Sequence, residues 1–159
     1  DSALANLFIV LEDGNEEQQR GQKFIIEKIK ENNVEDNFVL LGAKKNPFPY
    51  MGDADLYVQL SYHESFCLSL AEALILGVPV ISTNFEAAYE IVDDGKNGLI
   101  VEKEENLIAE TIIKMITDIN LRIGMKNEAK NIEISKFSSS GTEFIKMISN
   151  EGENKTNDA

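Results

Sequence analysis

Two glutamates stand eight residues apart at the ends of the stretch ESFCLSLAE, residues 64–72. Glu72 is the only charged residue between Phe66 and Ile81, in a run that otherwise has the composition of buried core. A carboxylate in such surroundings costs free energy unless a partner or water reaches it. Because carboxylates accept hydrogen bonds from hydroxyl groups, Glu64 and Glu72 are candidates for binding a sugar or a ribose.

A helix is expected over residues 66–76, ending before Gly77, because glycine commonly follows the last residue of a helix. At helical spacing Glu72, Ser69 and Ser65 share one narrow stripe, and the apolar remainder of the helix is expected to be buried. The stripe is either the solvent-facing side of a core helix or a slot that faces a polar ligand. The pattern alone leaves both interpretations open.

The amino end of this helix offers a second kind of binding group. Its first N–H groups, expected at residues 65–68, have no partners within the helix and carry a partial positive charge, which favours a phosphate. Together with the two carboxylates, they would suit a polyol phosphate, meaning a nucleotide or a nucleotide sugar.

These groups must be positioned by the surrounding elements, and the chain alternates short apolar strands with helices. Strands are expected at residues 7–11, 38–41, 55–60, 79–83 and 99–101, and helices at residues 16–33, 66–76, 86–92, from 104 onward, 121–134 and 142–148. Pro47 and Pro49 predict a loop. The alternation is typical of parallel βαβ units, whose right-handed crossovers put helices on both faces of one sheet. We therefore predict an α/β fold with a doubly wound, Rossmann-like parallel sheet and a ligand beyond the carboxyl ends of its strands.

The composition fits one soluble domain of 159 residues. A net charge of -13 argues against non-specific binding to nucleic acid or anionic lipid. No apolar stretch approaches the roughly 18 residues of a membrane span. The single cysteine, Cys67, cannot form an internal disulfide and is expected to be a small packing residue. The polar segment 150–159 is expected to be disordered.

Residues 46–101, NPFPYMGDADLYVQLSYHESFCLSLAEALILGVPVISTNFEAAYEIVDDGKNGLIV, resemble the C-terminal domain of glycosyltransferase family 4. The members of this family are retaining enzymes of the two-domain GT-B fold. The matching motifs are the E-x7-E pair, the GVPV of residues 77–80, the EIV of residues 90–92 and the NG of residues 97–98. The segment DNFVLLGAKKNPFPY, residues 36–50, also resembles the family, and the likeness runs over roughly residues 7–148.

The resemblance implies a role for each matching residue. Glu72 would accept hydrogen bonds from the ribose hydroxyls of the nucleotide. Glu64, the expected catalytic residue, would hold hydroxyls of the donor sugar near the reacting carbon. Phe66, Cys67 and Leu68 match a loop whose backbone amides reach the sugar and the diphosphate.

The resemblance also assigns residues near the start of the chain. The nucleotide base would lie against the backbone of Gly42, Ala43 and Lys44. Gly14 matches the glycine that follows the first strand. The family commonly has G-D-G or G-E-G there, and Glu12 in this chain would repel a phosphate if it pointed inward.

The loop after Glu64 departs from the family pattern. Ser65 stands where the family often has glycine, and Cys67 stands where it often has proline or a small residue. Ser65 is still expected to bind the donor, since its hydroxyl can donate a hydrogen bond. The loop has less backbone freedom than one with glycine at that position.

The family also has cationic residues, upstream of the first strand seen here, that neutralise the diphosphate, and an N-terminal domain that binds the acceptor. We therefore expect residues 1–149 to be a truncated donor-nucleotide-binding domain that binds weakly and is inactive alone. In the full-length enzyme it would serve transfer of a sugar from a nucleoside-diphosphate sugar to a carbohydrate or glycolipid acceptor. The resemblance implies no metal and no other cofactor, and a cytoplasmic enzyme at the inner membrane face.

Two alternatives share parts of this pattern. A GT-B-like nucleotide-sugar epimerase would have the same fold and ligand but would need further acid–base residues. A non-catalytic Rossmann-like interaction module would need no ligand slot. The sequence determines neither the donor sugar, the nucleobase nor the acceptor.

Overall fold

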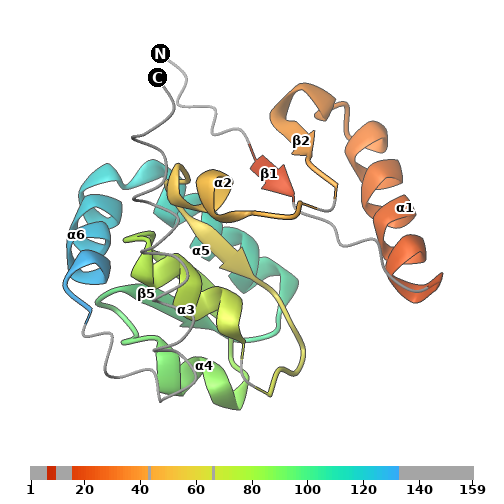
Figure 1. Ribbon diagram of the computed structural model, residues 1–159. Coiled ribbons are helices and arrows are strands. Elements are labelled where there is room, and N and C mark those ends of the chain that lie inside the picture. Colours follow the sequence, from red (N-terminus) through yellow and green to blue (C-terminus); the bar gives the residue numbers. More distant parts are fainter. Residues whose placement is uncertain (1–6, 10–15, 43, 66, 133–159) are drawn as a thin grey trace, which may run out of the picture. The chain divides into compact units, whose positions relative to one another are not determined.

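The computed structural model describes residues 7–9, 16–42, 44–65 and 67–132 (Figure 1). The chain divides into two compact units, residues 1–50 and residues 51–159, and each is described by itself. Among the described helices, none is long and apolar enough to cross a lipid bilayer. The helix predicted at residues 142–148 and the tail predicted at residues 150–159 lie outside the described residues.

The first unit contains one βαβ motif. Strand β1 (Leu7–Ile9) pairs in parallel with β2 (Phe38–Leu40), and helix α1 (Glu16–Glu31) connects them in sequence, followed by the short 3-10 helix η1 (Glu35–Asn37). These elements agree with the predicted ones within a few residues. The parallel pairing is what a crossover helix of this length requires.

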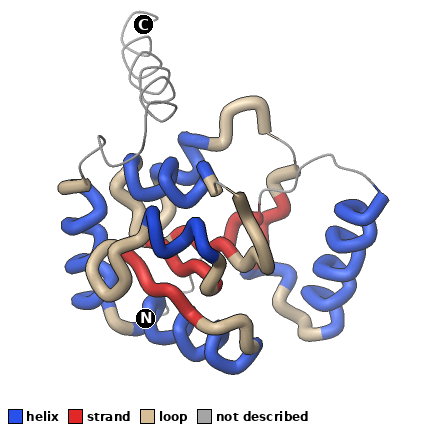
Figure 2. Tube along the Cα trace, turned by 90° about the horizontal axis from the view of Figure 1, so that it is seen from below, coloured by secondary structure: helices blue, strands red, loops and turns tan. Residues whose placement is uncertain are grey.

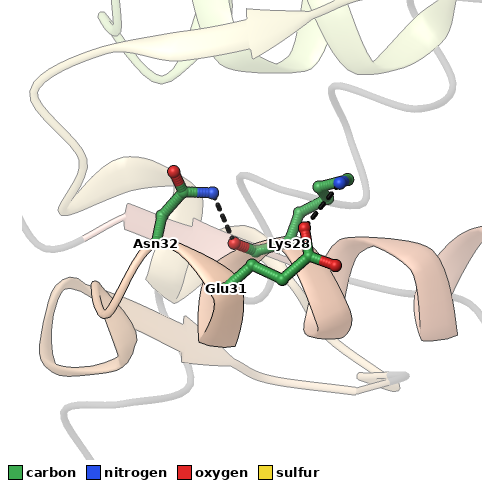
Figure 3. Close-up of polar contacts among 3 residues, drawn as sticks. All are labelled: Lys28, Glu31 and Asn32. Carbon is green, nitrogen blue, oxygen red and sulfur yellow. Dashed lines mark hydrogen bonds and ion pairs between the residues drawn. The ribbon is translucent and has the colours of Figure 1, made fainter.

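Helix α1 ends in side-chain and backbone contacts that satisfy its last carbonyl groups (Figure 3). The Asn32 amide nitrogen donates to the carbonyl oxygen of Lys28 at 2.8 Å, and the Lys28 ammonium donates to Glu31 Oε2 at 2.5 Å. Asn33 adopts a left-handed φ of 54°, and the N–H of Val34 donates back into the last turn. This is a Schellman-type C-cap with asparagine in place of the commoner glycine.

The remaining elements are helices and strands, drawn in blue and red in Figure 2. They are α2 (Phe48–Gly52), β3 (Tyr57–Gln59), α3 (Leu68–Ile75), β4 (Val80–Thr83), α4 (Glu86–Ile91), β5 (Gly98–Val101), α5 (Glu105–Thr117) and α6 (Ile119–Lys130). Strands β3, β4 and β5 form a parallel sheet in that order. The described strands thus pair as two sheets, one in each unit, whereas the sequence analysis expected a single sheet.

The β3–β4–β5 sheet carries helices on both faces (Figure 1). Side chains of α3 and α4, such as Leu74 and Ala88, pack with Val80 in one buried cluster. Met115 of α5 packs with Ile81 in a second cluster. Because neighbouring side chains on a strand point to opposite faces, Val80 and Ile81 of β4 reach different clusters. This arrangement confirms the prediction of a doubly wound, Rossmann-like α/β fold.

Helix α2 replaces part of the loop that the sequence predicted around Pro47 and Pro49. Pro49 is the second residue of this helix, a position where its missing N–H has no helical partner to lose. The N–H of Phe48 donates to Asn46 Oδ1 at 3.1 Å, so asparagine caps the helix start. The prolines therefore begin a helix here instead of excluding one.

Candidate functional site

The predicted ligand-binding residues of the second unit gather where β3 ends and α3 begins. Glu64 lies in the loop that joins the two elements, and Glu72 lies in the second turn of α3. This is the carboxyl end of a parallel strand, where ligands of doubly wound sheets bind. Whether these residues bind a ligand stays a prediction.

A ladder of hydrogen bonds leads along β3 to Glu64. The Tyr57 hydroxyl donates to Gln59 Oε1 at 2.7 Å, Gln59 Nε2 donates to Ser61 Oγ at 2.6 Å, and the Ser61 hydroxyl donates to Glu64 Oε1 at 2.8 Å. The Ser69 hydroxyl of α3 also donates to Gln59 Oε1, at 3.3 Å. The members at 57, 59 and 61 alternate along the chain and so share one side of it.

Sequence reasoning missed this ladder, although a signal was present. Apolar residues alternate at Leu56, Val58 and Leu60 within the strand predicted at residues 55–60. The same alternation puts Tyr57 and Gln59 on the opposite face, toward α3. Polar residues at alternate positions of a half-buried strand are expected to hydrogen-bond with one another.

The loop that carries Glu64 is held by the ends of the other two strands. The Thr83 hydroxyl, at the end of β4, donates to the carbonyl oxygen of Ser61. The Lys103 ammonium, just after β5, donates to the carbonyl oxygen of Tyr62 at 2.7 Å. All three strands of this sheet therefore contribute to the position of Glu64.

Glu72 is half-buried, and within the described part of the chain its carboxylate has no hydrogen bond and no ion pair. Burial raises the pKa of this carboxyl. Burial also raises the pKa of the Tyr57 hydroxyl, and the charges of Glu72 and Glu64 add to that shift. The two glutamates therefore act on the same buried hydroxyl, although eight residues separate them in the sequence.

The start of α3 differs from the prediction. The helix begins at Leu68, two residues later than expected, so Ser65 lies before the helix and does not extend the stripe of Ser69 and Glu72. Ser65 is exposed. Leu68, expected to be buried, is 55% exposed because it opens the first turn. The helix is thus buried on fewer sides than the sequence analysis assumed.

The N–H groups of Leu68 and Ser69 have no acceptor among the described residues, whereas the N–H of Leu70 donates to the carbonyl oxygen of Cys67 at 3.1 Å. These two groups are the unpaired donors of the helix start. They are the donors that a phosphate would use, and they lie about one turn ahead of Glu72. That these groups bind a phosphate stays a prediction.

The residues predicted to lie against a nucleotide base belong to the first unit. Gly42 follows β2 with a φ of 63°, a conformation that favours glycine. The Lys44 ammonium lies over the ring of Tyr50, 5.6 Å from its centroid. Gly14, Ala43 and Phe66, also predicted to bind the donor, lie outside the described residues.

The sequence of this chain matches a known family of enzymes over most of its length. Residues 5–132 match the family model described as glycosyl transferases group 1. The chain belongs to this family. The predicted sugar transferase is thereby confirmed at the level of the family, and the matches below all concern transferases of this kind.

Two curated group 1 relatives illustrate the likeness. The N-acetylgalactosamine-N,N'-diacetylbacillosaminyl-diphospho-undecaprenol 4-alpha-N-acetylgalactosaminyltransferase of Campylobacter jejuni is 36% identical over 104 residues, 64% of this chain and 28% of that protein. The 2-deoxystreptamine N-acetyl-D-glucosaminyltransferase of Niallia circulans is 30% identical over 133 residues, 82% of this chain and 33% of that protein. The chain thus spans about a third or less of these relatives.

Two solved structures share the fold. HepE of Anabaena in complex with UDP superposes with a TM-score of 0.76 at 23% identity, over 92% of this chain and 41% of that one. The C-terminal domain of a group 1 glycosyl transferase family protein from Francisella tularensis superposes with a TM-score of 0.64 at 27% identity, over 74% of this chain and 62% of that one. These neighbours have the GT-B architecture, in agreement with the predicted fold class.

Cys67 is the cap residue of α3 in this group 1 domain, and it is a buried residue of the core cluster, as expected for a packing residue. Burial raises the pKa of its thiol. Its φ of 38° and ψ of 57° are left-handed. This conformation costs an L-residue with a Cβ roughly 1–2 kcal/mol, so Cys67 stores local strain.

That strain gives a prediction for paired variants. Cys67→Gly should be more stable than Cys67→Ala by about 1 kcal/mol, because both lose the thiol but only glycine relieves the left-handed strain. Urea unfolding of the two variants measures the difference. Equal stabilities, or a more stable alanine variant, would show that residue 67 is not strained.

Proposed function

We propose that this chain is the donor-nucleotide-binding, C-terminal domain of a retaining family 4 glycosyltransferase. The full-length enzyme would transfer a sugar from a nucleoside-diphosphate sugar to a hydroxyl acceptor. The observation that carries the proposal is the half-buried Glu72 carboxylate, which has no partner among the described residues and lies close enough to Tyr57 to shift its pKa together with Glu64. A group in this condition is stabilised when a ligand donates hydrogen bonds to it.

Each group of the site has a role in this proposal. Glu72 accepts hydrogen bonds from the ribose hydroxyls, and Glu64 holds hydroxyls of the donor sugar near the reacting carbon. The unpaired N–H groups of Leu68 and Ser69 face the diphosphate. The barrier to transfer falls mainly because charge on the departing diphosphate is stabilised by such preorganised donors.

The charge of the chain sets a condition on this mechanism. With a net charge of -13 and only 15 lysines and arginines, the domain has few cations to offer a diphosphate. We propose that the cations come from a part of the enzyme outside this chain, and that neither a metal ion nor another cofactor takes part. With those cations supplied from elsewhere, we expect the chain alone to bind its donor weakly and to be inactive.

The relatives support the remaining details. The HepE structure contains UDP, and the Francisella structure is named as a C-terminal domain. The curated relatives are about three times as long as the aligned region, which leaves room for an N-terminal domain that binds a carbohydrate or glycolipid acceptor. One of them is named for an undecaprenol-linked acceptor, which supports a cytoplasmic enzyme working at the inner membrane face.

Titration of the ¹⁵N-labelled chain with UDP tests the proposal. We expect amide shifts concentrated at residues 64–72 that saturate with UDP, because the ribose and the diphosphate contact Glu72 and the start of α3. GDP titrated in parallel reports the base preference, and EDTA should leave the UDP response unchanged. If UDP and GDP both leave residues 64–72 unmoved, as an interaction module predicts, the donor site is elsewhere or absent.

A further inference from the structure

In the ladder of hydrogen bonds that leads to Glu64, each residue donates to the next one toward Glu64. A serine hydroxyl has a single proton to donate. Ser61 donates that proton to Glu64 Oε1 at 2.8 Å, so toward Gln59 it can only accept. Gln59 meets this condition, because its Nε2 donates to Ser61 Oγ at 2.6 Å.

Two further donors determine which end of the Gln59 amide faces Ser61. The Tyr57 hydroxyl, at 2.7 Å, and the Ser69 hydroxyl, at 3.3 Å, both point at Gln59 Oε1. If the amide were reversed, the Tyr57 and Ser69 hydroxyls would accept from its NH₂ group and lose the acceptor that they have now, and its oxygen would face Ser61. Ser61 would then turn its proton toward residue 59 and away from Glu64.

Gln59 also joins two elements of the fold. It lies at the end of β3, and its bond from Ser69 ties that end to the first turn of α3. It is part-buried, where a hydrogen bond meets less competition from water than at the surface. Among the described residues, no hydrogen bond joins Gln59 to Glu64 directly.

We propose that Gln59 is a positioning residue that orients the Glu64 carboxylate through the Ser61 hydroxyl. The inference rests on the proposed function, because it matters for donor selection only if Glu64 contacts the donor sugar. A side chain that can both donate and accept is required at residue 59, and an isosteric side chain that only accepts reverses the ladder. Glu64 then loses its donor and its fixed orientation.

Gln59→Glu is the decisive variant, since glutamate keeps the size and accepts from Tyr57 and Ser69 but has no proton for Ser61. Without ligand, we expect the ¹³Cδ resonance of Glu64 to shift in this variant, although no described hydrogen bond joins residue 59 to Glu64 directly. With ligand, we expect the ratio of the affinity for the best-binding UDP-sugar to the affinity for UDP to fall about tenfold. The reason is that a charge-assisted hydrogen bond is lost. UDP itself should bind within about twofold of the original affinity.

The probes are UDP, UDP-glucose, UDP-N-acetylglucosamine and UDP-N-acetylgalactosamine, measured on the 159-residue chain. Asn127→Asp, an exposed amide-to-carboxylate change on α6, is the matched control for added charge and should change neither readout. Gln59→Met keeps the volume without hydrogen bonds and leaves Ser61 free to donate to Glu64, so it should shift the Glu64 resonance less than Gln59→Glu does. Thermal unfolding of each variant establishes that it is folded.

The outcomes separate the two proposals. An unmoved Glu64 ¹³Cδ resonance in folded Gln59→Glu overturns the role of Gln59, whatever the donor data show, and so does an equal or larger shift in folded Gln59→Met. A parallel loss of UDP and UDP-sugar affinity also overturns it, because that indicates general damage to the site. A shifted Glu64 resonance in a chain that never prefers a UDP-sugar to UDP upholds the positioning role and refutes the donor-sugar role of Glu64.

Discussion

Glu72→Gln is expected to weaken UDP binding by at least about tenfold while leaving the domain as stable as before or more stable. The binding loss follows because charge-assisted hydrogen bonds from the ribose are worth about 1.5–3 kcal/mol each. The stability result follows because the carboxylate is half-buried without a partner among the described residues, so its charge opposes folding. Calorimetric titration with UDP and urea unfolding measure the two effects. Glu110→Gln, an exposed change on α5, is the control and should affect neither.

The same group makes the stability difference depend on pH. Burial raises the Glu72 pKa in the folded chain, so the folded state holds this proton to a higher pH than the unfolded state does. As pH rises from the ordinary carboxyl pKa through the raised one, the contribution of Glu72 to folding becomes less favourable. Glu72→Gln should therefore be as stable as the original protein below that window and more stable than it above. A glutamine variant that is less stable at neutral pH would mean that the folded chain stabilises the charged carboxylate.

Gly98→Ala is expected to destabilise the second unit by at least about 3 kcal/mol, a large fraction of the stability of a domain. A Cβ at this position would lie 2.6 Å from the carbonyl oxygen and 2.6 Å from Cγ2 of Val80, and 3.0 Å from Cγ1 of Val92. Val80 cannot retreat, because it is the partner of Gly98 in the β4–β5 register. The close approach of Val80 and Val92 therefore explains why the second residue of the NG motif, residues 97–98, is glycine. Urea unfolding followed by circular dichroism measures the loss.

Gly124→Ala provides the opposite control for the same chemical change. Gly124 lies within α6, and a Cβ there would meet no atom within 4 Å. Alanine is about 1 kcal/mol better than glycine inside a helix, so this variant should gain stability. If Gly98→Ala cost no more than about 1 kcal/mol, the tight approach of β5 to β4 would be contradicted.

Regular alternation made most of the fold predictable. The strands and the major helices were found because apolar residues recur at the strand or the helix period, as in the run before Gly77. Gly77 itself was correctly placed as a cap: its φ is 74°, and its N–H donates to the carbonyl oxygen of Leu74 at 2.9 Å. Helix α2 was missed because Pro47 and Pro49 were interpreted only as breakers of structure.

The site was predictable in its members more than in its geometry. Glu72 stood out as a charge within an apolar run and Glu64 as the charge just before it. The late start of α3 depends on the left-handed backbone of Cys67, which a side chain with a Cβ does not signal. That Glu72 lacks a partner among the described residues is a property of the packed chain. The direction of the ladder through Gln59 depends on which end of one amide faces Ser61, and composition cannot specify that.

The anchors on the loop that carries Glu64 imply an order of events during refolding. Lys103 reaches Tyr62 across 41 residues of chain, and Thr83 reaches Ser61 across 22. Closing such loops costs entropy that local helix formation does not pay. We therefore expect the loop that carries Glu64 to be fixed only after the ends of β4 and β5 have packed. A chain in which β5 has not joined the sheet would hold Glu64 less firmly.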